Sequence, residues 1–565
     1  MKTIKTNRKN IFPLTALVLS GVTFIAGCKT ADVTVPYTYT ENRLESKKTV
    51  STQSGLVSGI YNQDETVELF AGIPFAKPPV GELRWKEPED AEKWEGVYKA
   101  ENFKPMAMQK QNTKLFIKLF NAYIHSKGDR TDFAPVSEDC LYLNIWRPAN
   151  INEGEKLPVL VYVHGGALTS GSSWFESYDG EALAKQGIIM VTVAYRVGIF
   201  GYFSNEELSA ESINHTTGNY GLLDQIKALK WVHDNIENFS GDKNNITLAG
   251  ESAGSSSVNA ICCSPLAKGL FRRAIAESSS LVIPVPPHTF RSIESSLALG
   301  NEVMKEYKAS SIADLRKIKA ENLLKSKHVF NSMTVDGYAL TEYPWETYKK
   351  GLNNEEALLN GFNGDEGRAF TTLSKINRKN YKSLIKESPY VTDVDGILSL
   401  QEVKNDSDAK KLYTDMFSAV CFTYPHYSWT KMLCEQKKPV WLYCFNKTNI
   451  GISNMHSGEL VYAYGNLFRN NIYTDDDYKV SDAMQGYWLN FVRFGDPNGN
   501  PKSSDYGKTL PYWEKAFENG KFEGELLMLD TEIKMDRDPF LPFYKYLNFD
   551  INKEDRPVTY GRKED

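Results

Sequence analysis

Three uninterrupted apolar runs constrain the fold of this chain most strongly. They cover residues 157–163, 188–194 and 246–249, and none of them shows a strict alternation of apolar and polar side chains. A strand that is apolar on both faces must be covered on both faces, as in a parallel sheet between layers of helices. The sequence therefore predicts an α/β fold, not a sheet with one solvated face.

The segment before the third run has the period of an amphipathic helix. Between residues 221 and 236 the apolar side chains recur every three or four positions, so they share one face of a helix. They are Leu222, Ile226, Leu229, Val232 and Ile236. Two further apolar runs, at 357–362 and 439–445, are additional strand candidates. Strands that alternate with such helices indicate a central, mostly parallel sheet flanked by helices.

One large domain is expected over residues 50–549. No internal repeat or low-complexity linker divides this stretch, although the chain has 565 residues. Large α/β folds reach such a length as a single unit. Residues 550–565 are rich in charge and are expected to form a loose tail.

The first 28 residues have the pattern of an export signal. Basic residues among the first nine precede a mostly apolar stretch over 11–25, as in secretory signal peptides. The stretch is shorter than the roughly 20 residues that span a bilayer. It ends in Ile-Ala-Gly-Cys28, which resembles a bacterial lipobox and implies a signal peptide over 1–27 and acylation of Cys28.

An acylated Cys28 predicts an exported lipoprotein that several acyl chains hold at a membrane of the cell envelope. Residues 28–49, which are polar and rich in threonine, would then be a flexible tether. The alternative is an ordinary signal peptide with a chance cysteine, which would give a secreted or periplasmic protein.

Charge and cysteine usage exclude other classes of partner. The net charge is −5, with Lys and Arg spread throughout, so no nucleic-acid-binding face is expected. Apart from Cys28, six cysteines are scattered over the large domain, unlike a small disulfide framework. They show no CxxC pair and no His and Cys spacing typical of zinc. We therefore expect no metal and no cofactor, and no sequence feature indicates an oligomeric state.

A short glycine-flanked motif predicts the reactive residue. Gly250-Glu-Ser-Ala-Gly254 follows the apolar run 246–249 and precedes a helix expected from Ala253. GxSxG between a strand and a helix is the pattern of a nucleophile elbow. Side chains two positions from Ser252 would collide in so tight a turn, and glycine removes the collision. Ser252 is therefore the predicted nucleophile, with the Ala253 N–H beside the developing negative charge.

A serine hydroxyl needs a base, and that base needs an acid beside it. In α/β-hydrolases the acid and then the histidine follow the serine in the chain. Asp365 and Glu366, in the loop after 357–362, are the acid candidates, and the residues alone leave the choice open. Two histidines follow, of which His456 in a polar loop suits the role better than His426 in an aromatic stretch.

The loop after residues 157–163 offers further hydrogen-bond donors. His164-Gly-Gly-Ala167 is similar to the HGGG-type loop of esterases, whose backbone N–H groups point at a carbonyl oxygen. Because the oxyanion needs more than one donor, we expect this loop and the elbow to contribute together to one oxyanion hole.

Motifs spread over nearly the whole domain point to one family. They are FAGIPFAKPPVG at 70–81, SEDCLYLNIW at 137–146, GNYGLLDQ at 218–225, GLFRRAI at 269–275 and FVRFGDPN at 491–498. Together with the elbow, they resemble the type-B carboxylesterase family, which includes the cholinesterases. The resemblance implies an α/β-hydrolase fold and a serine esterase that hydrolyses carboxylic esters through an acyl-enzyme.

The same resemblance implies roles for single residues. It favours Glu366 over Asp365 as the acid and gives a triad of Ser252, His456 and Glu366. The implied oxyanion donors are the N–H groups of Gly166, Ala167 and Ala253, and the implied supporting residues are Glu251 and Ser278.

Departures from the family pattern bear on specificity. Ala167 replaces the third glycine of the family's oxyanion loop, and its Cβ is expected to narrow the site for bulky esters. Ala107 stands near the family's cysteine, so Cys140 lacks its implied disulfide partner. Residues 107–139 contain no tryptophan, which argues against choline esters.

Two other functions remain open at this point. A lipase or polyester-type hydrolase that acts at an interface would use the same residues on a different ester. A non-catalytic adhesion member of the same fold would need no nucleophile, and the retained Ser252, Glu366 and His456 speak against it.

Overall fold

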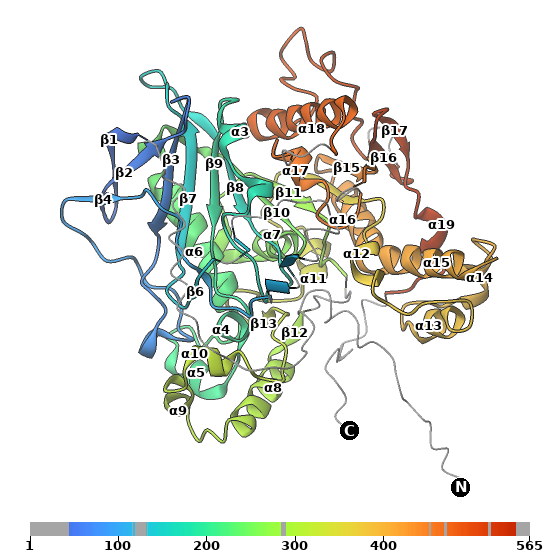
Figure 1. Cartoon of the computed structure of the whole chain (residues 1–565), viewed down its shortest axis with the longest axis horizontal. Helices are drawn as coiled ribbons and strands as arrows, with labels where there is room; N and C mark the ends of the chain where they lie inside the picture. Colours follow the sequence, from blue (N-terminus) through green and yellow to red (C-terminus); the bar gives the residue numbers. More distant parts are fainter. Residues whose placement is uncertain are drawn as a thin grey trace.

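Buried strands form a 13-stranded sheet through the middle of the molecule (Figure 1). The computed structural model describes residues 44–112, 114–115, 117–118, 131–132, 134–283, 290–450, 454–467, 472–517 and 521–549. The sheet runs in the order β1-β2-β3-β7-β9-β8-β10-β11-β14-β15-β16-β17, with β4 paired to β2. Its strands are β1 (Glu45–Thr52), β2 (Gly55–Tyr61), β3 (Val67–Pro74), β4 (Val97–Lys99), β7 (Tyr142–Pro148), β8 (Leu157–Val163), β9 (Ile189–Val193), β10 (Gly241–Glu251), β11 (Arg273–Glu277), β14 (Ala357–Asn363), β15 (Val440–Phe445), β16 (Glu525–Leu529) and β17 (Lys534–Arg537).

The central strands are parallel, and the outer ones are antiparallel except for β4, which runs parallel to β2. From β9 through β8, β10, β11, β14 and β15 to β16, every neighbouring pair is parallel. The pairs β1–β2, β2–β3, β3–β7, β7–β9 and β16–β17 are antiparallel. The prediction of an α/β fold with a mostly parallel central sheet is therefore confirmed, and antiparallel strands extend both edges.

Helices cover both faces of this sheet because its strands are apolar on both sides. One buried cluster joins the inward side chains of α6, α7 and α16 to one face, and a second joins those of α3, α17 and α18 to the other. The predicted helix 221–236 is α6, which begins at Tyr220 and ends at Asn235. The helices of the described residues are α3 (Glu181–Ala184), α4 (Gly198–Tyr202), α5 (Glu206–Glu211), α6 (Tyr220–Asn235), α7 (Ala253–Cys263), α8 (Ile293–Glu306), α9 (Ile312–Arg316), α10 (Ala320–Leu323), α11 (Pro344–Lys349), α12 (Arg368–Thr371), α13 (Tyr381–Glu387), α14 (Val394–Leu398), α15 (Asp406–Ser418), α16 (Tyr424–Glu435), α17 (Leu460–Ala463), α18 (Asp475–Phe494) and α19 (Leu541–Tyr544).

Short strand pairs lie outside the main sheet. β5 (Met106–Ala107) pairs with β6 (Val136–Ser137), and β12 (Arg291–Ser292) pairs with β13 (Thr334–Val335). The first pair places residues 106–107 beside residues 136–137.

The start of the domain differs from the expected boundary at residue 50. Residues 45–49 already belong to β1, which pairs with β2 and buries Val50. The expected signal peptide 1–27, the acylation site Cys28, the tether up to residue 43 and the tail 550–565 lie outside the described residues. Within the described ranges, no helix combines the length and the apolar character that crossing a bilayer requires.

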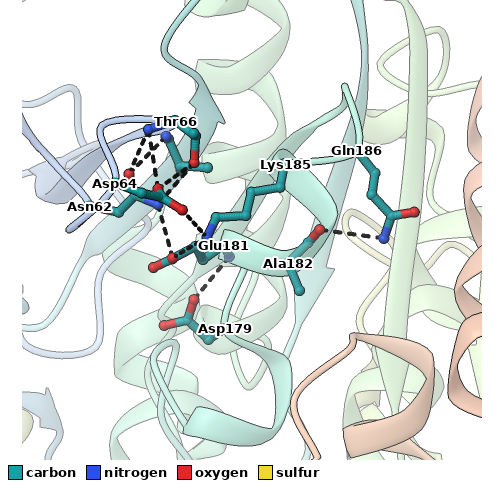
Figure 2. A network of polar contacts seen from close by, with 9 residues as sticks. Asn62, Asp64, Thr66, Asp179, Glu181, Ala182, Lys185 and Gln186 are labelled. Atoms are coloured by element: carbon teal, nitrogen blue, oxygen red, sulfur yellow. Dashed lines mark hydrogen bonds and ion pairs between the residues drawn. The ribbon is translucent and has the colours of Figure 1, made fainter. Parts of the chain in front are cut away.

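A polar network fixes the turn between β2 and β3 to α3 (Figure 2). Asn62 Oδ1 accepts the Thr66 N–H at 2.9 Å, which closes the turn. The Asn62 side-chain amide then donates to Glu181 Oε1 at 2.9 Å, and Lys185 Nζ lies 2.9 Å from Asp64 Oδ2. Exposed ion pairs add little stability, so these contacts serve mainly to orient the antiparallel edge against α3.

Candidate active site

Ser252 lies at the turn between β10 and α7, where the backbone is strained. Its φ of 55° and ψ of −126° are rare for a residue with a side chain, and such strain occurs mainly at functional sites. A Cβ at Gly250 would lie 2.6 Å from the Gly254 carbonyl carbon, and one at Gly254 would overlap the Val163 carbonyl oxygen. Both flanking glycines are therefore required by close backbone approach.

Short contacts connect Ser252 to His456 and Glu366. His456 Nε2 lies 2.9 Å from Ser252 Oγ, and His456 Nδ1 lies 2.6 Å from Glu366 Oε2. The other oxygen of Glu366 accepts the backbone N–H of Asn363 at 2.8 Å. The three side chains follow β10, β14 and β15, whose carboxyl ends meet at one edge of the sheet, where such folds bind ligands.

The rival acid and base lie elsewhere. The Asp365 carboxylate lies 3.8 Å from Arg368, and its backbone N–H donates to the Asn454 carbonyl. His426 is buried between α16 and β14, with Nδ1 2.5 Å from the side-chain oxygen of Asn360. Burial lowers the pKa of His426 to about 3, so it stays neutral. The geometry thus brings Glu366 and His456, and not these two residues, to Ser252.

The glycine-rich loop after β8 packs against the elbow. A Cβ at Gly165 would lie 2.8 Å from the Glu251 carbonyl oxygen and 3.0 Å from Ser252 Cβ. Gly166 and Ala167 follow with φ of 107° and 57°. Ala167 is a buried residue in the left-handed region, which costs energy for a side chain with a Cβ. The loop therefore approaches the nucleophile most closely at Gly165, directly before these two residues.

Glu251 and Glu459 add two further buried carboxyl groups to this region. Glu251 Oε1 lies 3.4 Å from His456 Nε2 and accepts the Ser457 hydroxyl at 2.5 Å. Burial raises the pKa of Glu251 to about 6. The Ser278 hydroxyl donates to Glu459 at 3.1 Å, so the second expected supporting residue holds a neighbouring carboxyl group.

Two phenylalanines pack on the imidazole of His456. The ring centroids of Phe370 and Phe422 lie 5.1 and 4.9 Å from that of His456. Phe422 belongs to a π-helical turn, Ala419–Thr423, between α15 and α16. π-helical turns of this kind are frequent at functional sites. The residues around His456 therefore exclude water from one side of the ring.

Sequence reasoning missed several residues of this site. Asn363 is the clearest case, because its side-chain amide also donates to the Met455 carbonyl at 3.0 Å and bonds Glu459. It is the last residue of β14, three positions before Glu366, so its nearness in sequence was a usable signal. Phe422 carries no such signal, since it reaches the site from a distant segment. The same holds for Glu277 at the end of β11, whose backbone carbonyl accepts the Ser252 N–H at 2.8 Å.

A model of the carboxylesterase family matches residues 46–545 of the chain. The chain belongs to this family. Fumonisin B1 esterase of Sphingopyxis macrogoltabida is 33% identical to this carboxylesterase over 476 residues, which cover 80% of the chain and 83% of that protein. Carboxylesterase 1C of Rattus norvegicus is 33% identical over 503 residues, 83% of the chain and 88% of that protein. Cocaine esterase of Homo sapiens is 30% identical over 504 residues, 82% of the chain and 85% of that protein.

These relatives agree with the family match in activity class. The carboxylesterase is a carboxylic ester hydrolase with an α/β-hydrolase fold. In the part of the chain that the structure describes, no three His, Cys, Asp or Glu side chains gather as the ligands of a metal would. Cys140 is buried and free.

Proposed function

We propose that this carboxylesterase hydrolyses small-molecule carboxylic esters through an acyl-enzyme on Ser252. The observation that supports this most directly is the pair of contacts that joins Ser252 Oγ to His456 at 2.9 Å and His456 to Glu366 at 2.6 Å. A buried carboxylate on Nδ1 fixes the imidazole orientation and stabilises its protonated form.

The reaction then proceeds in two halves. His456 Nε2 takes the Ser252 proton while Oγ attacks the ester carbonyl, and the imidazolium returns the proton to the departing alcohol. The backbone N–H groups of Gly166, Ala167 and Ala253 stabilise the oxyanion, each contributing on the order of 3 kcal/mol. Water, deprotonated by His456, hydrolyses the acyl-enzyme and restores Ser252.

A short-chain p-nitrophenyl ester tests this function. The wild type should release p-nitrophenol catalytically, and Ser252→Ala should lose nearly all of that activity. Ser257 is a matched control, because its hydroxyl donates to the Ala253 carbonyl within α7. Ser257→Ala should stay within about threefold of the wild type, since no proton transfer depends on it. If the wild type is inactive toward a broad panel of esters, this result would favour the adhesion alternative. If it prefers emulsified over dissolved esters, this result would favour the lipase alternative.

We further propose that the protein is exported and anchored to a membrane of the cell envelope through an acylated Cys28. The basic start, the apolar stretch over 11–25 and the lipobox-like Ile-Ala-Gly-Cys28 support this proposal. Metabolic labelling with a fatty-acid analogue should tag the wild type. The Cys28→Ser protein should carry no tag and should no longer be recovered with the membrane fraction. A Cys28→Ser protein that remains acylated and membrane-bound would contradict the proposal.

A further inference from the structure

We propose that Gln109 is a positioning residue of the oxyanion loop, because its side-chain amide fixes Gly171, where that loop closes. The proposal rests on the function proposed above, in which the backbone N–H groups of Gly166 and Ala167 bind the oxyanion. Gln109 is 6% exposed and lies on a segment remote in sequence from Ser252, His456 and Glu366.

The amide of Gln109 pairs with both backbone groups of one residue. Gly171 donates its N–H to Gln109 Oε1 at 2.9 Å, and Gln109 Nε2 donates to the Gly171 carbonyl at 2.7 Å. The same Nε2 also donates to the Ala107 carbonyl at 3.0 Å. The side-chain amide thus bonds the backbone of Gly171 as a residue of a neighbouring strand would. The carbonyl of Ala107, at the end of β5, fixes the orientation of that amide.

Gly171 in turn packs closely against the start of the loop. Its φ is 122°, and a Cβ there would overlap His164 Nδ1 and lie 2.5 Å from the Gly165 carbonyl oxygen. Between these points the loop folds back on itself, because the N–H groups of Thr169 and Ser170 both donate to the Gly166 carbonyl at 3.0 Å. A shift of Gly171 would therefore move the peptide groups on either side of Gly166.

The loop needs external support because its backbone is strained. Ala167 and Leu168 are consecutive residues with φ of 57° and 58°. Such conformations persist only where surrounding contacts determine them. The Leu168 carbonyl accepts the Gly198 N–H at 2.6 Å, and the Tyr195 hydroxyl donates to the His164 carbonyl at 2.8 Å. Gln109 supplies the corresponding support at the other end of the loop.

Replacement of the amide by an apolar side chain of similar length isolates this role. In Gln109→Met we expect kcat to fall about 10- to 100-fold, because small misplacements of catalytic groups cost up to about 100-fold. KM should stay within about threefold, since the loss concerns the oxyanion of the transition state. The rate is expressed per active site, counted by titration with an organophosphate, so unfolded protein does not enter the value.

Gln111, two residues further along the same segment, is the matched control. Its Nε2 donates to the Ala134 carbonyl at 2.5 Å and not to the oxyanion loop. Gln111→Met should therefore change kcat less than about threefold. Equal losses of kcat in Gln109→Met and Gln111→Met would show that the segment after β5 matters as a whole and would overturn the assignment to Gln109.

A carboxyl group at the same position adds a pH readout. A protonated carboxyl can accept from the Gly171 N–H and donate to its carbonyl, as the amide does, whereas a carboxylate has no donor. The ratio of wild-type to Gln109→Glu kcat should therefore shrink severalfold as the pH falls through the ionisation of the new carboxyl. The same ratio for Gln111→Glu should remain constant.

The outcomes separate this inference from the proposed function. A Gln109→Met protein with wild-type kcat, or a pH-independent ratio for Gln109→Glu, would overturn the role of Gln109 and leave the contrast between wild type and Ser252→Ala intact. Where Gln109→Met gives no folded protein, Gln109→Asn keeps a polar amide that is too short to reach Gly171. Wild-type kcat in Gln109→Asn would equally overturn the inference.

Discussion

At the scale of single residues, the imidazole of His456 stands between two carboxylates. Glu366 lies 2.6 Å from Nδ1 and Glu251 lies 3.4 Å from Nε2. Burial favours the neutral ring, but the two carboxylates outweigh it and raise the pKa of His456 above the ordinary 6.5. Because protonation removes the base, kcat/KM should decline on acidification from a pH already above 6.5.

Removal of one carboxylate should move that acid limb. Glu251→Gln removes a negative charge that stabilises protonated His456, so the pKa of His456 should fall. The acid limb of kcat/KM for a neutral ester should therefore move to lower pH by roughly half a unit to one unit. Glu277 supplies the control, because burial raises its pKa to about 8 and leaves it uncharged at lower pH. Glu277→Gln should leave the limb in place. A limb that moves upward in Glu251→Gln would contradict this electrostatic account.

The adjacent acids Asp365 and Glu366 should differ sharply in their contribution. Glu366→Gln should lower kcat by about 10³- to 10⁴-fold, since the amide can no longer stabilise the imidazolium. Asp365→Asn should cost less than about tenfold, because Asp365 faces Arg368 and not His456. Steady-state kinetics of both variants on one ester decides this, and a larger loss in Asp365→Asn would reverse the assignment.

Ser252, His456 and the loop glycines could be predicted from the sequence because each lies in a local motif with a steric or chemical reason. The choice of Glu366 over Asp365 needed the family resemblance, since both acids share one loop. Gln109 and Phe422 could not be predicted, because each acts through contacts with a segment far away in the chain. Such contacts leave no periodic or local trace in a single sequence.

At the scale of elements, the elbow depends on the approach of α7 to β8. A Cβ at Gly254 would overlap the Val163 carbonyl oxygen, which belongs to a central strand and cannot move freely. Gly254→Ala should therefore destabilise the fold by about 1–3 kcal/mol or more. Gly486 in α18 is the control, because its Cβ would meet only the end of the Leu510 side chain at 3.0 Å. Gly486→Ala should be near neutral in urea unfolding, and equal losses in both variants would contradict this reasoning.

Continuous apolar runs predicted the central strands well. β8 has the expected bounds, and β15 begins one residue later than the expected 439. β10 extends back to Gly241, because its first half is polar and partly exposed and gives no apolar signal. The antiparallel strands β3 and β7 carry the buried ion pair Glu68–Arg147, with 2.7 Å between Oε2 and Nε. Charged residues in a buried strand contradict an apolar pattern, so hydrophobicity alone does not reveal these antiparallel strands.

At the scale of the whole molecule, buried acids make the stability depend on pH. Burial raises the pKa of Glu277 from the ordinary 4.5 to about 8, although Trp488 and Tyr464 both donate to its carboxyl. Between these two values the folded state keeps a proton that the unfolded state has lost. The contribution of Glu277 is therefore fully favourable below about pH 4.5, and stability decreases as the pH rises toward 8.

The variant Glu277→Gln should weaken this dependence. Between roughly pH 5 and 8, the decline of the unfolding free energy should become less steep by up to about 1.4 kcal/mol per pH unit, the value for one proton. Glu95→Gln, at an exposed position, should leave the slope unchanged. Urea unfolding at several pH values measures both. An identical slope in the wild type and Glu277→Gln would show that Glu277 titrates normally in the folded protein.

The fold as a whole brings together three side chains that are separated by more than a hundred residues between Ser252 and Glu366 and by 90 between Glu366 and His456. Stoichiometric labelling with an organophosphorus fluoride tests their joint action most directly. Ser252 Oγ should displace fluoride from phosphorus, and the proton should pass to His456. We predict one phosphoryl group per chain, located on Ser252 by peptide mass spectrometry, with loss of esterase activity in proportion to the label. Activity that survives complete labelling of Ser252, or that falls as the label accumulates on another residue, would contradict the account.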